Sequence, residues 1–246
     1  MISLKSILKN SLKELFPGRC LSCGNGEEEG RILCQPCLGS VAVPPPNLCA
    51  NCARPLGFTY EIDTGGEYFC GECRLDPPPY DSAIYGLGYE GPVRELVHTF
   101  KFGNSPYLAQ YLVELGGERL GPWLAGKKGA IMVPVPLHWI RLYNRGYNHA
   151  HLLSKKLAKN CGLYMGESFL VRTRYTKMQY GLNAQQRKDN VRAAFSAPHP
   201  GAIKGRDIVL FDDIITTGAT ARECCKALWK AKPNSVSLAA LCKAGQ

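Results

Sequence analysis

Two adjacent acids and a loop of small hydroxylated residues stand together near the carboxyl end of the chain. Asp212 and Asp213 follow the apolar run Ile208 to Phe211, which has the composition of a buried parallel strand. A helix is predicted from about Thr220 to Trp229. A strand that leads into a helix amino terminus directs free backbone N–H groups and the positive end of the helix dipole at one point. We therefore expect the connecting loop to bind an anion such as phosphate.

The residue types in and before this loop specify the expected ligand further. Gly218 allows the backbone to curl tightly around an anion, and the threonines add hydroxyl donors. The expected phosphate-binding residues are Thr216, Thr217, Gly218, Ala219 and Thr220. Asp212 and Asp213 cannot bind a phosphate, so their natural partners are the vicinal hydroxyls of a sugar, with a divalent metal ion nearby. A phosphate beside a diol describes ribose 5-phosphate.

The segment Asp-Asp-Ile-Ile-Thr-Thr-Gly-Ala-Thr at 212–220 resembles the signature of type I phosphoribosyltransferases. The resemblance implies that Asp212 and Asp213 contact the ribose hydroxyls and act in catalysis. It also implies that the threonine loop holds the 5-phosphate of phosphoribosyl pyrophosphate, which binds with magnesium. The fold implied is α/β, a type I phosphoribosyltransferase-like doubly wound parallel sheet.

A basic stretch follows another predicted strand, Ala130 to Val135. Arg141 and Arg145 come next, and a helix is predicted from about Asn148 to Asn160. A guanidinium group binds phosphate oxygens through a bidentate fork. By analogy, this stretch resembles the loop that receives pyrophosphate in the same transferases, and Arg141 and Arg145 are its expected counter-charges.

Eight of the twelve cysteines form four C-x-x-C pairs before residue 74. The pairs are Cys20/Cys23, Cys34/Cys37, Cys49/Cys52 and Cys70/Cys73. A structural zinc ion takes four thiolates in a tetrahedron, and each C-x-x-C turn supplies two, so four pairs predict two zinc ions. The triple proline at 44–46 favours pairing in sequence order, with the first two pairs on one ion and the last two on the other. Interleaved pairing stays open.

Both zinc ions are expected to be structural, because four thiolates leave no coordination position for water or substrate. A segment of about sixty residues with few large apolar groups needs metal binding for much of its folding free energy. The alternative is redox-active C-x-x-C pairs, and four pairs at zinc-ribbon spacing argue against it.

Composition divides the chain into three parts. Residues 1–76 are expected to hold an opening helix and the double zinc ribbon, residues 77–79 a stiff proline linker, and residues 80–246 the phosphoribosyltransferase-like domain. The elements predicted at the start of that domain are a strand over Ser82 to Tyr89 and helices over Pro92 to Phe102 and Tyr107 to Leu115.

The opening twenty residues have apolar residues at helical spacing that lysines interrupt, so they lack the continuous apolar core of a secretion signal. We expect this helix to pack on its own protein, with a membrane-surface anchor as the alternative. No stretch approaches the roughly 18 uninterrupted apolar residues of a membrane span. The sequence therefore predicts a soluble, cytoplasmic protein.

Positive charge is concentrated in residues 127–192, which hold thirteen Lys or Arg and two acids (13 − 2 = +11), against +10 for the whole chain. Such a field implies a polyanionic partner, either a pyrophosphate-bearing small molecule or a nucleic acid backbone. The segment also carries aromatic residues, and this mixture binds single strands by stacking. These are Trp139, Tyr143, Tyr147, Tyr164, Phe169, Tyr175 and Tyr180. The alternative is that several are core residues and that the charge serves only the small molecule.

Together these motifs resemble the ComF family of bacterial phosphoribosyltransferase-like proteins. The resemblance covers almost the whole chain and adds Arg145-Gly146-Tyr147-Asn148, the stretch from Arg172 to Asn190, and Phe195. His149 departs from the family pattern, which usually has Gln there. The resemblance implies a role in natural competence, with single-stranded DNA as a partner and DNA-processing proteins as candidate partners of the zinc module.

Two functions are consistent with these features. The first is a protein of DNA uptake and processing that binds phosphoribosyl pyrophosphate and single-stranded DNA. The second is an active magnesium-dependent phosphoribosyltransferase that acts on an unidentified base. In either case the resemblance implies that residues 174–206 correspond to a mobile loop that closes over substrate, and their polar composition suits a lid.

Overall fold

The computed structural model describes residues 18–27, 31–57, 68–176 and 183–245. The helix expected at the start of the chain lies outside these residues, as do residues 177–182 of the segment expected to form a lid. None of the described helices is long and apolar enough to cross a membrane.

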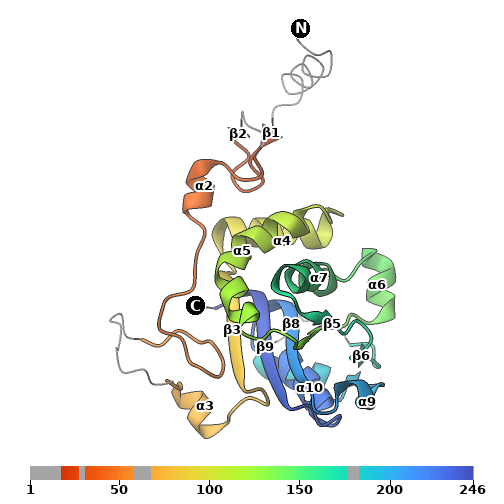
Figure 1. The fold of residues 1–246 in the computed structure, drawn as a ribbon. Helices are drawn as coiled ribbons and strands as arrows, with labels where there is room; N and C mark the ends of the chain where they lie inside the picture. The colour runs from red at the N-terminus through yellow and green to blue at the C-terminus, as the bar shows by residue number, and fades with distance from the viewer. Residues whose placement is uncertain (1–17, 28–30, 58–67, 177–182, 246) are drawn as a thin grey trace.

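A five-stranded parallel sheet forms the centre of the fold (Figure 1). Its order is β3 (Ser82–Gly88), β9 (Ser235–Lys243), β8 (Asp207–Ile215), β4 (Ile131–Pro134) and β5 (Tyr164–Met165). The chain steps from β8 to β9 in one direction along the sheet and from β4 to β5 in the other. In open α/β sheets such a reversal leaves a crevice at the carboxyl ends of the strands, where ligands bind.

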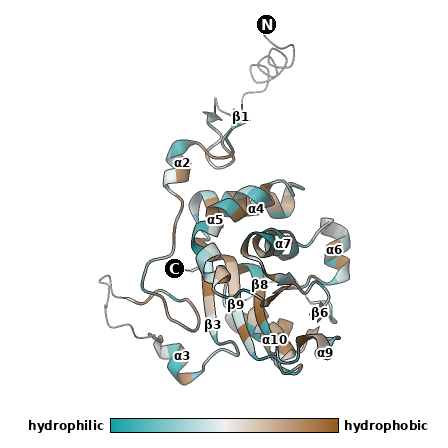
Figure 2. Ribbon diagram, viewed as in Figure 1, coloured by the Kyte–Doolittle hydropathy of each residue, from teal (hydrophilic) through white to brown (hydrophobic). Residues whose placement is uncertain are grey.

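Helices cover both faces of the sheet, as the predicted doubly wound fold requires. One face carries α4 (Gly91–Phe102), α5 (Leu108–Ala125) and α7 (His149–Cys161), and the other carries α10 (Ala219–Trp229) and α8 (Ala184–Val191). In β8, Val209 and Phe211 pack towards the first group while Ile208 and Leu210 pack towards α10. The apolar colour of the central strands in Figure 2 follows from burial on both faces.

Helix α5 continues ten residues past its predicted end at Leu115. The prediction stopped there because Gly116 and Gly117 follow, and glycine weakens a helix. The structure gives Gly116 a packing role, because α5 crosses β3 closely. A Cβ atom added at Gly86 in β3 would lie only 2.8 Å from the backbone oxygen of Gly116.

Two features around the expected site differ from the prediction. Strand β8 extends to Ile215, so both acids lie inside the strand instead of standing in a loop, and Asp212 pairs with Ala240 of β9. A short helix that the sequence did not predict, α6 (Trp139–Arg145), begins after His138 and ends at Gly146, whose φ of 76° is left-handed.

The expected lid is largely built into the fold. Its described part forms α8, strand β7 (Phe195–Ser196) and helix α9 (Pro200–Ile203), and β7 pairs with β6 (Val171–Arg172). Val191, Ala194 and Ile203 are fully buried against the α10 side of the sheet. The prediction of one mobile loop over 174–206 is therefore wrong for the residues that the structure describes, because apolar positions within the polar segment anchor it.

The cysteine-rich part runs from beside the α4 and α5 layer to the β3 edge of the sheet (Figure 1). Its elements are β1 (Gly18–Arg19), β2 (Gly26–Glu27), α2 (Gln35–Gly39) and α3 (Gly71–Leu75). The backbone N–H of Gly88 donates to the carbonyl of Ala42 at 2.8 Å, so this part of the chain covers the end of an otherwise open edge strand. The indole N–H of Trp229 in α10 donates to the carbonyl of Pro79 at 2.9 Å and holds the proline linker in place.

Candidate functional site

A cleft of about 930 Å³ opens at the carboxyl ends of β3, β8 and β4, where the strand order reverses. Its lining comes from four segments that are distant in the sequence. They are the end of β3 with α4, the loop after β4, the start of α7, and the end of β8 with the start of α10. A volume of this size accommodates a sugar phosphate together with a further group.

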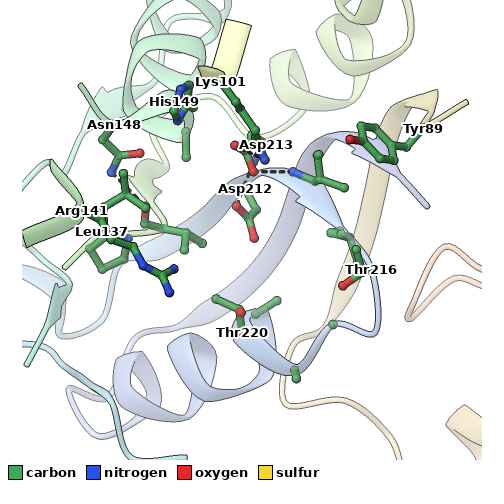
Figure 3. Close-up of a pocket in the computed structure, with 18 of the residues that line it drawn as sticks. Tyr89, Lys101, Leu137, Arg141, Asn148, His149, Asp212, Asp213, Thr216 and Thr220 are labelled. Carbon is green, nitrogen blue, oxygen red and sulfur yellow. Dashed lines mark hydrogen bonds and ion pairs between the residues drawn. The ribbon is translucent and has the colours of Figure 1, made fainter. Parts of the chain in front are cut away.

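Asp212 and Asp213 lie at the centre of this cleft (Figure 3). The ammonium group of Lys101, at the end of α4, lies 2.9 Å from Oδ2 of Asp213, and both side chains are about 15% exposed. Oδ1 of Asp213 accepts the backbone N–H of Ile214 at 2.8 Å, and Oδ1 of Asp212 accepts that of Asp213 at 2.9 Å. These contacts fix the two carboxylates at the floor of the cleft.

The two carboxyl groups differ in acidity. Burial and the adjacent Asp213 carboxylate raise the pKa of Asp212 to about 8. Burial also acts to raise the pKa of Asp213, but the Lys101 ammonium group outweighs it and the pKa falls below its ordinary value. The pair therefore holds one ionised carboxylate and one that gains a negative charge when a cation approaches.

The threonine loop borders the cleft directly below the acids. Thr216 and Thr220 face the two carboxylates from that side (Figure 3). Gly218, with φ of 73°, takes the position before the first turn of α10, so the loop needs the left-handed conformation that glycine adopts without strain. The first residues of α10 line the cleft, and the start of a helix offers free N–H groups to an anion there. Of the five predicted phosphate-binding residues, Thr217 is exposed and is not among the residues that line the cleft.

Two arginines flank the opposite side of the site. Arg141 in α6 extends into the cleft, and its Nη2 donates to the carbonyl of Thr176 at 2.8 Å (Figure 3). Arg172 also lines the cleft, donates to the Thr176 hydroxyl, and lies over the ring of Phe195. Burial, and to a smaller extent the positive charge of nearby Arg141, lowers the pKa of Arg172 to about 10, so the group stays charged at neutral pH. Arg145 ends α6, and its side chain lies outside the described part of the chain.

Asn148 and His149 stand at the start of α7 and line the cleft. The Asn148 side chain caps α7 by accepting the N–H of His151 at 3.3 Å, and it donates to the carbonyl of Val135 at 3.0 Å. His149 is buried and packs edge-on against Phe100 with ring centroids 4.9 Å apart. His149 also acts electrostatically on Asp213, whose pKa it lowers.

Sequence reasoning missed three residues that line the cleft close to the acids. Lys101 was assigned only to a helix, Arg172 only to a family motif, and Tyr89 only to a strand end. Their residue types did not indicate a binding site, because lysines and arginines are common on any solvent-exposed surface. Only the packing of α4 beside β8 brings Lys101 to Asp213.

The eight cysteines form two groups of four in sequence order. Within each group the sulfur atoms all lie within 4.8 Å of one another. The Sγ atoms of Cys23 and Cys34 are 3.7 Å apart, as are those of Cys52 and Cys70. A zinc ion with Zn–S bonds of about 2.3 Å requires sulfur separations of about 3.8 Å, so both groups fit tetrahedral zinc.

The first cysteine of each group is prepared to ligate as a thiolate. Burial raises the pKa of Cys20, but hydrogen bonds from the backbone N–H groups of Cys23 and Cys34 outweigh it and bring the pKa to about 6. Cys49 occupies the equivalent place, with its pKa lowered to about 7, and accepts the N–H of Cys70 at 3.3 Å. N–H···S hydrogen bonds of this kind support zinc-bound thiolates.

The aromatic residues of the basic segment divide between surface and core. Trp139, Tyr143 and Tyr175 are 70%, 87% and 50% exposed, and Tyr164 is also exposed. Tyr147 instead packs beside Phe100 and donates its hydroxyl to that residue's carbonyl at 2.6 Å, while Phe169 packs against the core. Tyr180 lies outside the described residues. Trp139 and Tyr143 stand on α6 with Arg141, and the ring of Tyr175 packs against His138 just before this helix.

Comparisons with known proteins agree with both parts of this description. A model of the double zinc ribbon domain matches residues 11–74, and a model of the phosphoribosyl transferase domain matches residues 143–246. The two four-cysteine sites lie within the first match, and the second match covers β5, β8 and β9 of the sheet with the two acids and the threonine loop.

Two relatives align over nearly their full length. Competence protein F of Haemophilus influenzae is 30% identical over 224 residues, which cover 86% of this chain and 96% of that protein. DNA utilization protein YhgH of Escherichia coli K12 is 29% identical over 233 residues, covering 92% and 97%. Among solved structures, a hypoxanthine phosphoribosyltransferase from Trypanosoma cruzi covers 56% of this chain and 65% of its own, with 15% identity and a TM-score of 0.35.

Proposed function

This chain belongs to the family of Competence protein F and YhgH, with a double zinc ribbon and a phosphoribosyltransferase domain, and from that premise we propose that its cleft binds phosphoribosyl pyrophosphate with magnesium. We further propose that it binds single-stranded DNA and acts in the uptake and processing of DNA. Its relatives carry the names of competence and DNA-utilization proteins, which supports the second proposal.

The observation that carries the first proposal is the convergence of three kinds of group in one cleft. The threonine loop offers backbone N–H groups and hydroxyls to a 5-phosphate, and Asp212 and Asp213 line the same cleft beside it. Arg141 and Arg172 provide cations for a pyrophosphate. Magnesium would enter with the pyrophosphate and neutralise part of its charge, while the chain's own residues fix the ribose.

Binding of phosphoribosyl pyrophosphate in the presence of magnesium tests this proposal. We expect Asp213→Asn to weaken the affinity about 10- to 100-fold, since a charge-assisted hydrogen bond to the ribose and the anchor for Lys101 are both lost. Isothermal titration calorimetry measures the change. Glu118→Gln, an exposed acid on α5, is the matched control and should bind like the wild type. Equal affinity of Asp213→Asn and wild type would remove these acids from the site.

The exposed aromatic residues support the DNA proposal. Trp139, Tyr143 and Tyr175 stand on and beside α6 within the segment of charge +11. Cations along a phosphate backbone together with open aromatic faces are how proteins bind single strands without sequence preference. The same α6 carries Arg141 into the cleft, so a strand on this surface would lie next to the phosphoribosyl site.

A fluorescent single-stranded oligonucleotide titrated over a salt series tests DNA binding. We expect binding to weaken steeply with salt, and Trp139→Ala and Tyr143→Ala each to cost about tenfold in affinity at fixed salt. Tyr107→Ala, equally exposed at 65% but outside this segment, is the control. Displacement of the strand by phosphoribosyl pyrophosphate with magnesium would mean that the basic residues serve both ligands. No binding at low salt would assign the charge to the small molecule alone.

The second candidate function is magnesium-dependent transfer of the phosphoribosyl group to a base. The intact pair of acids and the threonine loop favour it, because the acids would stabilise positive charge on the ribose and the loop would hold its 5-phosphate, while Arg141 and Arg172 face the leaving pyrophosphate. Release of pyrophosphate that depends on an added base would support this function.

We also place the domain boundary at the prolines 77–79 and the protein in the cytoplasm. Two four-cysteine sites support the second point, since thiolate ligands persist where thiols stay reduced.

A further inference from the structure

The cleft has a second side, formed by α4, that the proposed phosphoribosyl contacts leave unused. Arg94, His98, Lys101 and Phe102 line the cleft from this helix, and Tyr89 at the end of β3 joins them. We refer to these four helix residues as the α4 wall. We propose that the α4 wall and Tyr89 bind one nucleotide unit, with its base against the aromatic rings and its phosphate at Arg94.

The α4 wall is a continuous and firmly held surface. Its residues lie four, seven and eight positions after Arg94, which places all of them on one side of a helix. The opposite side of α4 is fixed in the core by Val93, Leu96, Val97 and Phe100, all fully buried. The side chains of the wall are therefore presented to the cleft from a rigid element.

The rings of the wall suit a flat aromatic ligand. The centroids of His98 and Phe102 are 5.0 Å apart with their planes at 45°, and Phe102 is 57% exposed at the cleft. Tyr89 approaches from the neighbouring strand end, where its backbone N–H donates to the carbonyl of Lys243 at 2.9 Å. A nucleobase offers two π faces, and stacking on such rings is independent of which base it is.

The charges of the wall select an anion over a neutral ring. Lys101 is paired with Asp213 at 2.9 Å, while Arg94 lies two helical turns away and presents a guanidinium group to the same cleft. His98 stands between them on the helix. The acids Glu90 and Glu95 of this part of α4 are not among the residues that line the cleft. A base linked to a phosphate matches rings beside a guanidinium better than a free base does.

The nucleotide unit would lie beside phosphoribosyl pyrophosphate and not in its place. Figure 3 shows Tyr89 and Arg141 on opposite sides of the two carboxylates, so the Tyr89 side stays open when a pyrophosphate occupies the Arg141 side. The inference thus goes beyond the proposed function, because neither phosphoribosyl pyrophosphate nor the α6 surface uses Arg94, His98 or Phe102.

Titration of the full-length, zinc-loaded protein with deoxyadenosine monophosphate tests the subsite, with and without saturating phosphoribosyl pyrophosphate and magnesium. We expect Phe102→Ala and Arg94→Gln each to weaken nucleotide binding about tenfold. The matched controls are Tyr107→Ala for an exposed ring and Arg206→Gln for an exposed arginine at the far end of β8, and both should bind like the wild type. Affinity for phosphoribosyl pyrophosphate should be the same in all four variants.

Two results would overturn the proposal. One is the absence of nucleotide binding to the wild type. The other is nucleotide binding that Phe102→Ala leaves unchanged and phosphoribosyl pyrophosphate abolishes, since that would place the nucleotide on the threonine loop. Failure of phosphoribosyl pyrophosphate to bind would instead count against the proposed function, and the effect of Phe102→Ala on the nucleotide would still report on the subsite.

The nucleotide could come from a free monophosphate or from a single strand, and competition distinguishes these sources. If the monophosphate displaces a labelled oligonucleotide from the wild type but not from Phe102→Ala, the subsite holds a nucleotide of a strand. If it binds with the predicted sensitivity to Phe102→Ala and displaces no oligonucleotide, the subsite serves free nucleotides. Both outcomes support the subsite.

Discussion

At the scale of single residues, the site depends on one lysine that pairs with only one of two adjacent aspartates. Lys101 contacts Asp213 and leaves Asp212 with burial and a like charge as its main influences. Adjacent carboxylates in a buried place do not both stay ionised without a cation. The arrangement therefore suits a ligand that brings positive charge or hydroxyl donors to Asp212.

This difference predicts a pH effect on stability. The pKa of Asp212 is about 8 in the folded protein against 3.8 as its ordinary value, so folding takes up a proton between these two pH values. The contribution of Asp212 to the free energy of unfolding thus falls as pH rises towards 8 and is constant above it. Asn at this position has no proton to lose. We expect Asp212→Asn to gain stability relative to the wild type from pH 6 to pH 8 and then to keep that gain.

Urea denaturation of the zinc-loaded, ligand-free protein at several pH values measures the effect. Asp189→Asn, an exposed acid on α8, should track the wild type throughout. A difference between Asp212→Asn and wild type that is the same at pH 6 and pH 9 would show that Asp212 titrates normally in the folded protein.

At the scale of elements, each part of the cleft depends on where a helix or strand ends. Strand β8 ends at Ile215, just beyond the acids, and α10 starts at Ala219, so the threonine loop between them is short and its geometry is fixed. The last turn of α4 supplies Lys101 to the acids, and the loop after β4 with α6 supplies Arg141. The site is therefore assembled from ends of rigid elements, which limits the motion of its side chains.

Helix α6 is the element with two tasks. On one side of the helix, Arg141 donates a hydrogen bond to the carbonyl of Thr176, while Trp139 and Tyr143 are exposed on the surface. Trp139 and Tyr143 lie four positions apart on α6, so their exposed rings stand on one face of the helix, and exposed apolar patches on soluble proteins mark interaction sites. This observation supports the DNA proposal independently of net charge.

At the scale of the whole molecule, the zinc ribbons and the sheet domain share their packing. Cys20, Leu33 and Cys34 belong to the same apolar cluster as α4 and α5. Near the second site, Lys243 at the end of β9 donates to the carbonyl of Cys52 at 3.4 Å, and Arg222 of α10 contacts Asp76. The ribbons are thus docked on the domain at two places, and zinc helps to hold a surface of the core.

Loss of one ligand tests the zinc sites at this scale. Cys34→Ser should lower the zinc content from two ions to one per chain, because three thiolates hold zinc far more weakly than four. The thermal unfolding temperature should fall, since the ribbon around Cys34 covers part of the α5 cluster, while phosphoribosyl pyrophosphate binding is retained. Elemental analysis after gel filtration and circular dichroism measure both effects.

Cys161→Ser is the control, because Cys161 lies in α7 outside both four-cysteine groups. It should keep two zinc ions. Retention of both ions by Cys34→Ser, or loss of both, would contradict the assignment of four cysteines to each ion.

The sequence by itself determined the features that local spacing encodes. Four C-x-x-C pairs gave two groups of four thiolates, and an apolar run followed by Asp212, Asp213 and the threonine loop gave a strand, a turn and a helix start. These patterns are contained within a few residues each, so backbone geometry alone relates their side chains. The parallel α/β fold followed from them and from the family resemblance.

Only the tertiary structure decided which distant segments meet. The order of strands places β8 beside β4 and brings α4 over the carboxyl edge, and this brings Lys101 to Asp213 and adds Arg94, His98 and Phe102 to the cleft. Burial of Val191 and Ile203, which the polar composition around them concealed, turned an expected lid into packed structure. Sequence periodicity reports which face of an element is apolar, but the neighbour of that face depends on the packing of the whole sheet.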